Sequence, residues 1–225
     1  KAVWYAGMYV MAAWFLLANL RFMLRLRRSR KPYPVENCPY PVYLTAELPS
    51  PCLFGLFHPA VYLTPASVET LRHVLAHETT HARHGDPIWS LLRCVCLAVY
   101  WFDPLVWAAA IVSRRDCELA CDEGALKRLG EDERIPYGRT LLRLIPVARK
   151  PESPMLSATT MTAGKRELKD RVTRIAENRR TMGVALLAVV TAAALVCALT
   201  FTGAKPSVRS LTGEELSEYA LAFNT

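Results

Sequence analysis

Two long stretches without a charged side chain constrain this chain more than any other feature of its sequence. Residues 2–20 and 181–204 are both uncharged, and roughly 20 apolar residues are enough for an α-helix to cross a bilayer. The overall composition agrees, because 52% of residues are hydrophobic and the mean hydropathy is +0.14, more apolar than is typical of a soluble domain. We therefore predict a mainly α-helical integral membrane protein with transmembrane helices at 1–20 and 181–204.

The basic residues indicate which side of the membrane the middle of the chain faces. One basic cluster follows the first apolar stretch, between Arg21 and Lys31, and another precedes the second, between Lys165 and Arg180. Positively charged flanks of transmembrane helices stay in the cytoplasm, so we predict a cytoplasmic domain over residues 21–180 and an extracytoplasmic tail over 205–225. These clusters account for much of the net charge of +8 without nucleic acid. A DNA-binding helix at 165–180 remains an alternative.

A third apolar segment, residues 87–113, is interrupted by Arg93, Asp103 and Pro104. Asp followed by Pro is typical of a helix N-cap and the first helical residue. The sequence therefore predicts two helices that meet near Asp103. Whether they form the core of the domain or enter the membrane stays open.

A metal-binding pattern, His77-Glu78-Thr79-Thr80-His81, lies in the middle of the chain. Thr64 and Pro65 predict the start of its helix, and Gly85 predicts the end. Residues four apart share a helix face, so His77 and His81 can direct their imidazoles at one metal ion. Glu78 can then act on a water molecule as general base. An ordinary polar helix with solvated histidines is the alternative.

A catalytic zinc site takes three protein ligands, so another element must supply the third. Glu118 and Asp122, four residues apart on the second of the two expected helices, are the candidates. Either could bind the metal while the other supports a ligand from behind, and a charged surface is the alternative. Asp86 could orient a ligand imidazole through its second ring nitrogen.

Short β-favouring segments precede the metal-binding helix. Residues 42–44 and 60–63 predict two strands, and an edge strand at Val61 and Tyr62 could hold a peptide substrate in extended form. A structural hairpin is the alternative. Residues 130–163 contain several prolines and predict a flexible connection that could serve as a self-cleavage loop.

Four blocks of the chain resemble the BlaR/MecR-type membrane metallopeptidases, which are zincin-like, more narrowly gluzincin-like, proteases of antirepressor sensor-transducers. The blocks are LRHVLAHETTHARHGD (71–86), YWFDPLVW (100–107), CELACDEGAL (117–126) and IPYGRTLL (135–142). The resemblance implies one Zn²⁺ per chain bound by His77, His81 and Glu118, with Glu78 catalytic and Asp122 behind a ligand. It also implies a helical protease domain with a small β-sheet between membrane helices.

The same resemblance implies a bacterial plasma-membrane enzyme that cleaves a cytoplasmic protein, such as a transcriptional repressor, or itself, in response to an external signal. We further expect that it could form a homodimer and that it does not bind nucleic acid directly. The tail at 205–225 is too short for a sensor domain, so we expect that region to be truncated or absent. A membrane quality-control zinc protease and a non-catalytic signalling scaffold are the alternative functions.

Overall fold

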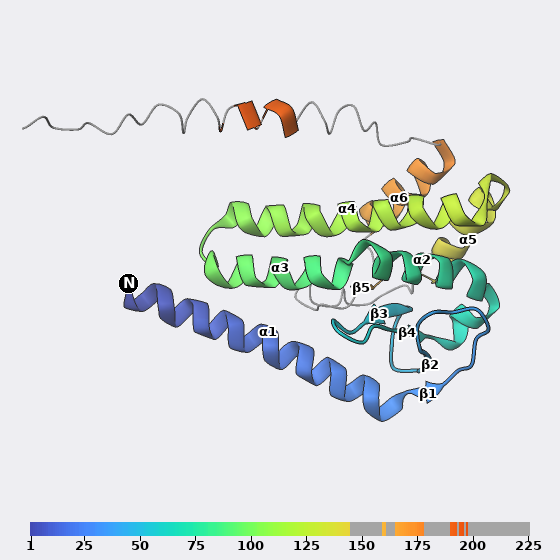
Figure 1. Ribbon diagram of the computed structural model, residues 1–225, viewed down its shortest axis with the longest axis horizontal. Helices are drawn as coiled ribbons and strands as arrows, with labels where there is room; N and C mark the ends of the chain where they lie inside the picture. The colour runs from blue at the N-terminus through green and yellow to red at the C-terminus, as the bar shows by residue number, and fades with distance from the viewer. Residues whose placement is uncertain (145–158, 161–164, 178–189, 193, 196, 198–225) are drawn as a thin grey trace, which may run out of the picture. The chain divides into compact units, whose positions relative to one another are not determined.

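The computed structural model describes residues 1–144, 159–160, 165–177, 190–192, 194–195 and 197. The chain divides into two units, Lys1–Arg179 and Arg180–Thr225. Most of the predicted helix at 181–204 and the whole tail at 205–225 lie outside the described residues. The first unit is mainly helical with a small mixed sheet, which confirms the predicted fold class at that level (Figure 1).

The N-terminal apolar stretch forms α1 (Ala2–Ser29), which continues beyond residue 20 through the basic cluster. Phe15, Phe22 and Leu26 are its buried residues and pack against the rest of the unit. Most of its other apolar side chains are exposed. Among the described residues, α1 is the one helix whose length and composition would allow it to cross a membrane.

The sheet contains five strands in the order β1-β2-β4-β3-β5, namely β1 (Lys31–Pro32), β2 (Val42–Leu44), β3 (Cys52–Phe54), β4 (Ala60–Leu63) and β5 (Thr159–Thr160). Strands at 42–44 and 60–63 were predicted, but they do not form a hairpin. They run parallel, with Tyr43 opposite Tyr62, because β3 lies between them in sequence and pairs antiparallel with β4.

The sheet order also shows that the edge position predicted for the strand of Val61 and Tyr62 is wrong. Both residues lie on β4, an internal strand that is paired with β2 on one side and β3 on the other. Val61 and Tyr62 are also buried, with 0% and 4% exposure. Their backbone groups are used within the sheet, so a peptide cannot add at this strand.

Helices α2 (Leu71–His84), α3 (Asp86–Val99) and α4 (Pro104–Leu129) follow the sheet. Thr64 and Pro65 begin a separate 3₁₀ helix, η1 (Pro65–Thr70), so the predicted start of the metal-binding helix was too early. Gly85 ends α2 in a left-handed conformation (φ 70°), as predicted. Asp103 caps α4 by accepting a hydrogen bond from the backbone N–H of Leu105, which confirms the predicted boundary.

Part of the predicted connection at 130–163 is helical instead. After the short 3₁₀ helix η2 (Glu131–Glu133), residues Arg134–Leu144 form α5, and 145–158 and 161–164 lie outside the described residues. Helix α6 (Lys165–Glu177) packs against α4 and α5. One apolar core joins the sheet to α2, α4, α5 and α6 and includes Leu53, Val61, Val74, Ala125, Leu141 and Ile175. This core fixes the helices that carry the site.

Candidate metal centre

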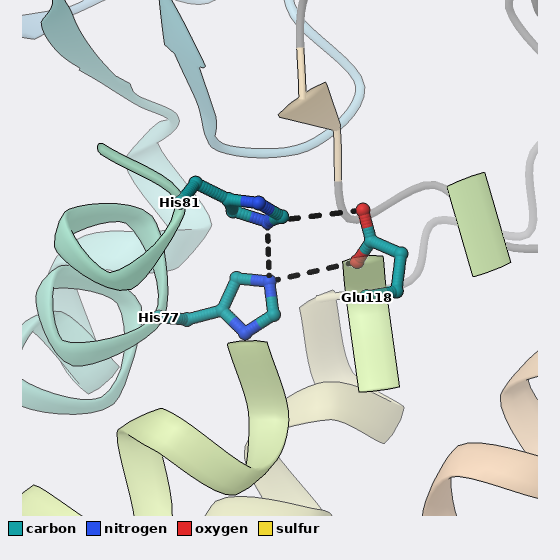
Figure 2. Close-up of side chains that lie close together, drawn as sticks. All are labelled: His77, His81 and Glu118. Carbon is teal, nitrogen blue, oxygen red and sulfur yellow. Dashed lines mark hydrogen bonds and ion pairs between the residues drawn. The ribbon is translucent and has the colours of Figure 1, made fainter. Parts of the chain in front are cut away.

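Helix α2 presents both histidines of the metal-binding pattern on one buried face. Successive turns bring the Nε2 atoms of His77 and His81 to 3.0 Å from each other, with their side chains 0% and 1% exposed (Figure 2). The face can be buried because α2 packs closely against α4. A Cβ built on Gly124 of α4 would lie 2.7 Å from the Thr80 methyl group, so only glycine fits there without displacement.

Glu118 of α4 faces the two imidazoles. Its Oε2 lies 3.5 Å from His77 Nε2 and its Oε1 lies 3.8 Å from His81 Nε2 (Figure 2). The three side chains form a candidate metal-binding group whose ligand atoms all lie within 4.8 Å of one another. Zinc–nitrogen bonds of about 2.0–2.1 Å in a tetrahedron separate two ligand atoms by about 3.3 Å. The observed distances bracket that value, so this donor set fits a zinc ion.

Glu78 lies beside this group and is also fully buried. Among the described residues, no side chain makes a hydrogen bond with either oxygen of its carboxylate, and the backbone of Leu53 in β3 lies next to it. Burial raises the pKa of Glu78 above its ordinary value, against the lowering effect of the two histidines. A buried carboxylate with unused acceptors has the capacity to bind and deprotonate a water molecule.

His81 is held from behind by Asp86, the residue that follows the Gly85 turn. The Asp86 carboxylate accepts a hydrogen bond from His81 Nδ1 at 2.6 Å. This contact leaves Nε2 free to bind a metal ion and fixes the plane of the ring. The thiol of Cys121 lies 3.2 Å from both His81 Nδ1 and the Asp86 carboxylate. Sequence reasoning had assigned no role to Cys121.

His77 is held by a longer chain of contacts that includes Tyr137 of α5. Its Nδ1 lies 2.8 Å from the Tyr137 hydroxyl, which in turn donates a hydrogen bond to Asp122 at 2.8 Å. A hydroxyl that donates to Asp122 accepts from His77, so Nδ1 keeps its proton and Nε2 is the nitrogen that can bind a metal ion once it has lost its own proton. Burial lowers the pKa of His77, but its contacts with Asp122 and Glu118 outweigh that effect and raise it to about 9.

Arg171 of α6 completes the site and is 1% exposed. Two of its nitrogens donate hydrogen bonds to the Asp122 carboxylate at 2.7 Å, and a third lies 3.0 Å from Glu118 Oε2. Although burial raises the pKa of each carboxyl group, the guanidinium of Arg171 and the contacts with the histidines together outweigh it. The pKa of Glu118 falls to about 2 and that of Asp122 also falls. The structure thus brings Glu118 to the metal position and Asp122 behind His77.

Sequence reasoning missed Tyr137 and Arg171 as members of the site. Arg171 was counted with the basic residues that flank a membrane helix. A signal was available, because Arg171 shares one face of α6 with Leu168 and Ile175, both of which belong to or pack on the core. An arginine on the apolar face of an amphipathic helix must have a buried partner. Of the other two histidines of α2, His73 contacts Thr140 and Glu133, and His84 lies 3.7 Å from the Cys121 thiol.

Comparison with known proteins agrees with this geometry. A family model described as BlaR1 peptidase M56 matches residues 1–175. The chain is 26% identical over 196 residues to the regulatory protein BlaR1 of Bacillus licheniformis. The matched region is 77% of this chain and 32% of that protein. It is 30% identical over 104 residues to the methicillin resistance mecR1 protein of Staphylococcus aureus. Here the matched region is 44% of this chain and 18% of that protein. The chain therefore spans about a third or less of the length of these relatives.

Proposed function

The chain belongs to the BlaR1 peptidase M56 family, and from this premise we propose that it is a membrane-anchored zinc endopeptidase that performs regulatory proteolysis. One observation carries the proposal. Glu78 is fully buried, has no side-chain hydrogen-bond partner in the described part of the chain, and lies beside three ligand atoms whose spacing suits a tetrahedral zinc ion. A metal site with a purely structural role does not require a buried carboxylate with unused acceptor atoms beside the ion.

Different residues of the chain have different roles in the proposed reaction. His77, His81 and Glu118 would hold the zinc ion, which supplies Lewis-acid polarisation of a water molecule and of the scissile carbonyl. Glu78 accepts the proton of the attacking water and returns it to the leaving amine. Asp86 and Tyr137 keep both imidazoles in the tautomer that leaves Nε2 free.

The substrate would lie along β3 instead of β4. The backbone of β3 at Leu53 contacts Glu78, and beyond β3 the sheet continues only through two residues of β5 among those described (Figure 1). An extended peptide that took the place of β5, antiparallel to β3, would pass the candidate metal position. Because β5 is itself a segment of this chain, its pairing with β3 supports self-cleavage as one activity. The other expected substrate is a cytoplasmic protein such as a transcriptional repressor.

The membrane anchoring rests on α1, with its exposed apolar surface and its basic C-terminal end. We propose that it crosses the bacterial plasma membrane with a second helix at 181–204, that the domain between them is cytoplasmic, and that direct nucleic-acid binding is not part of the function. A homodimer in the membrane is compatible with this arrangement.

The test compares the full chain with its Glu78→Gln variant in detergent, with Glu69→Gln as control because Glu69 is exposed on η1, away from the buried site. Metal content and cleavage, of the chain itself and of a peptide mixture, are measured on all three. We expect about one zinc ion per chain in each, and cleavage in the Glu78→Gln variant reduced about 10²–10⁴-fold.

Other results of this test would contradict parts of the proposal. Full activity of the Glu78→Gln protein would show that another group is the base. Absence of bound zinc under zinc-replete conditions would overturn the proposal in favour of a signalling scaffold. Zinc-dependent cleavage of any unfolded protein, without selectivity, would favour a quality-control protease.

A further inference from the structure

The α3–α4 hairpin exposes apolar residues on its outer surface, as the lipid-facing part of a membrane protein does. Between residues 88 and 112, the residues on the exposed surface are all apolar or aromatic. The most exposed of the large ones are Leu105 (76%), Ile88 (64%), Ile111 (63%), Phe102 (58%) and Val112 (55%). A surface helix of a water-soluble domain carries polar residues on its outer face. The later turns of α4 do so, since Asp116, Lys127 and Arg128 are exposed there.

The charged side chains of this segment have internal partners. Arg93 of α3 donates to the Ser113 hydroxyl on α4 at 3.3 Å and is half-buried. Asp103, at the tip, accepts from the backbone N–H of Leu105 at 2.8 Å. A polar group in hydrocarbon must find its partner within the protein, because no water is available. The two charged side chains of the hairpin therefore have partners within the protein, and its exposed residues are apolar or aromatic.

Helix α1 runs alongside this hairpin (Figure 1). The Trp4 indole donates to the Val99 carbonyl at 3.0 Å, and the Trp101 ring lies directly against Gly7. The tip of the hairpin is thus level with the first turns of α1. To Arg21, where charges begin after the apolar stretch of α1, the rise is about 25 Å from Trp4 and about 20 Å from Gly7. On α4 the uncharged part, from Pro104 to the residue before Arg114, rises about 15 Å.

We propose that the α3–α4 hairpin is a re-entrant element, inserted among the lipid acyl chains beside α1 from the side on which the basic residues lie. Its depth of about 15–25 Å is less than the roughly 30 Å hydrocarbon core, and both of its ends lie on the side of the basic residues, so it enters the bilayer without crossing it. The inference rests on the proposed membrane anchoring by α1. Lipid is the occupant that fits, because the exposed surfaces of α1, α3 and α4 are apolar on several sides, whereas a partner protein would cover one face.

This insertion places the metal centre at the membrane surface. Helix α4 is continuous from the hairpin tip to Leu129, and Glu118 follows Ser113 by little more than one turn. The rise from Ser113 to Glu118 is about 8 Å. The site would therefore act on peptide segments held close to the bilayer. The expected substrates are then membrane-proximal segments of this chain itself or of a cytoplasmic protein substrate.

The test measures where single exposed positions lie, with nitroxide labels on the full chain in phosphatidylethanolamine–phosphatidylglycerol vesicles. The buried Cys52 and Cys121 are kept, and the other native cysteines are replaced by Ser or Ala: Cys38, Cys94, Cys96, Cys117 and Cys197. Leu105→Cys and Ile111→Cys report on the hairpin, Lys127→Cys on the charged part of α4 and Val10→Cys on α1. Collision rates are measured with oxygen, which dissolves in acyl chains, and with a water-soluble nickel chelate.

We expect the oxygen-to-nickel accessibility ratio at residue 105 to exceed that at residue 127 by at least about tenfold, because the polar chelate does not enter hydrocarbon. Residue 105, nearer the tip, should give a higher ratio than residue 111. High nickel accessibility at residue 105 would overturn the proposal, and low accessibility to both reagents would assign the surface to a protein partner. If residue 10 lies in lipid and residue 105 does not, the hairpin inference alone fails. If residue 10 also lies in water, the proposed anchoring fails with it.

Discussion

Replacing Arg171 by Gln is expected to weaken zinc binding and to destabilise the domain, because two buried carboxylates depend on its guanidinium. Glu118 and Asp122 are 4% and 3% exposed, and Arg171 contacts both at 2.7–3.0 Å. Gln offers no positive charge and cannot reach both carboxylates at once. The variant would leave two negative charges buried beside each other on successive turns of α4.

The magnitude follows from the burial of these groups. Removing one partner of a buried ion pair costs about 3–5 kcal/mol, because the remaining charge is left uncompensated. Loss of a group that orients a metal ligand lowers metal affinity about 10–100-fold. Arg171 contacts Glu118, the proposed metal ligand, and Asp122, which holds His77 through Tyr137. The Arg171→Gln variant should therefore show both a lower stability and a lower affinity for zinc.

The assay is competition for zinc against a chelator of known affinity, with thermal unfolding measured on the same samples in detergent. Arg174→Gln is the matched control, because Arg174 is exposed on the same helix and loses the same charge. Arg171→Lys retains the charge without the planar fork, so an intermediate affinity is expected. Wild-type zinc affinity and unfolding midpoint in the Arg171→Gln variant would refute the reasoning. Tighter zinc binding would show that Arg171 acts only as a charge that repels the ion.

Three further predictions follow from the same geometry. Asp86→Asn should lower zinc affinity about 10–100-fold, because it removes the carboxylate that orients His81. Zinc affinity should rise with pH by about tenfold per unit up to about pH 9, because below the raised pKa of metal-free His77, about 9, the ion must displace a proton. Gly124→Val should destabilise the domain by about 1–3 kcal/mol, because a side chain there meets Thr80 at the closest approach of α2 and α4.

Chelator competition, repeated across pH for the second prediction, checks the first two. A zinc affinity that does not change with pH would show that His77 is already neutral in the metal-free protein. Unfolding of Gly124→Val is compared with Ala120→Val, since Ala120 is exposed on the same helix. Equal stability of these two variants would contradict the close packing of α2 on α4. An Asp86→Asn protein with wild-type affinity would show that packing alone orients His81.

The sequence by itself determined several of the local elements and half of the candidate metal site. Period and end signals predicted the helix that carries His77, Glu78 and His81, its end at Gly85, and the boundary at Asp103. These features depend on neighbours in sequence, through i,i+4 geometry and capping, so a linear pattern contains them. The β-propensity of 42–44 and 60–63 was likewise sufficient to place two strands.

Only the tertiary structure decided how those elements meet. Spacing alone left Glu118 and Asp122 nearly equivalent, and the packing of α4 on α2 directs Glu118 at the imidazoles and Asp122 at Tyr137. Strand order placed β4 inside the sheet and β3 beside Glu78. The position of Arg171 between the two carboxylates depends on the docking of α6, about 50 residues further along the chain. Contacts between elements so far apart in sequence are set by the shape of the shared core, and no local pattern records them.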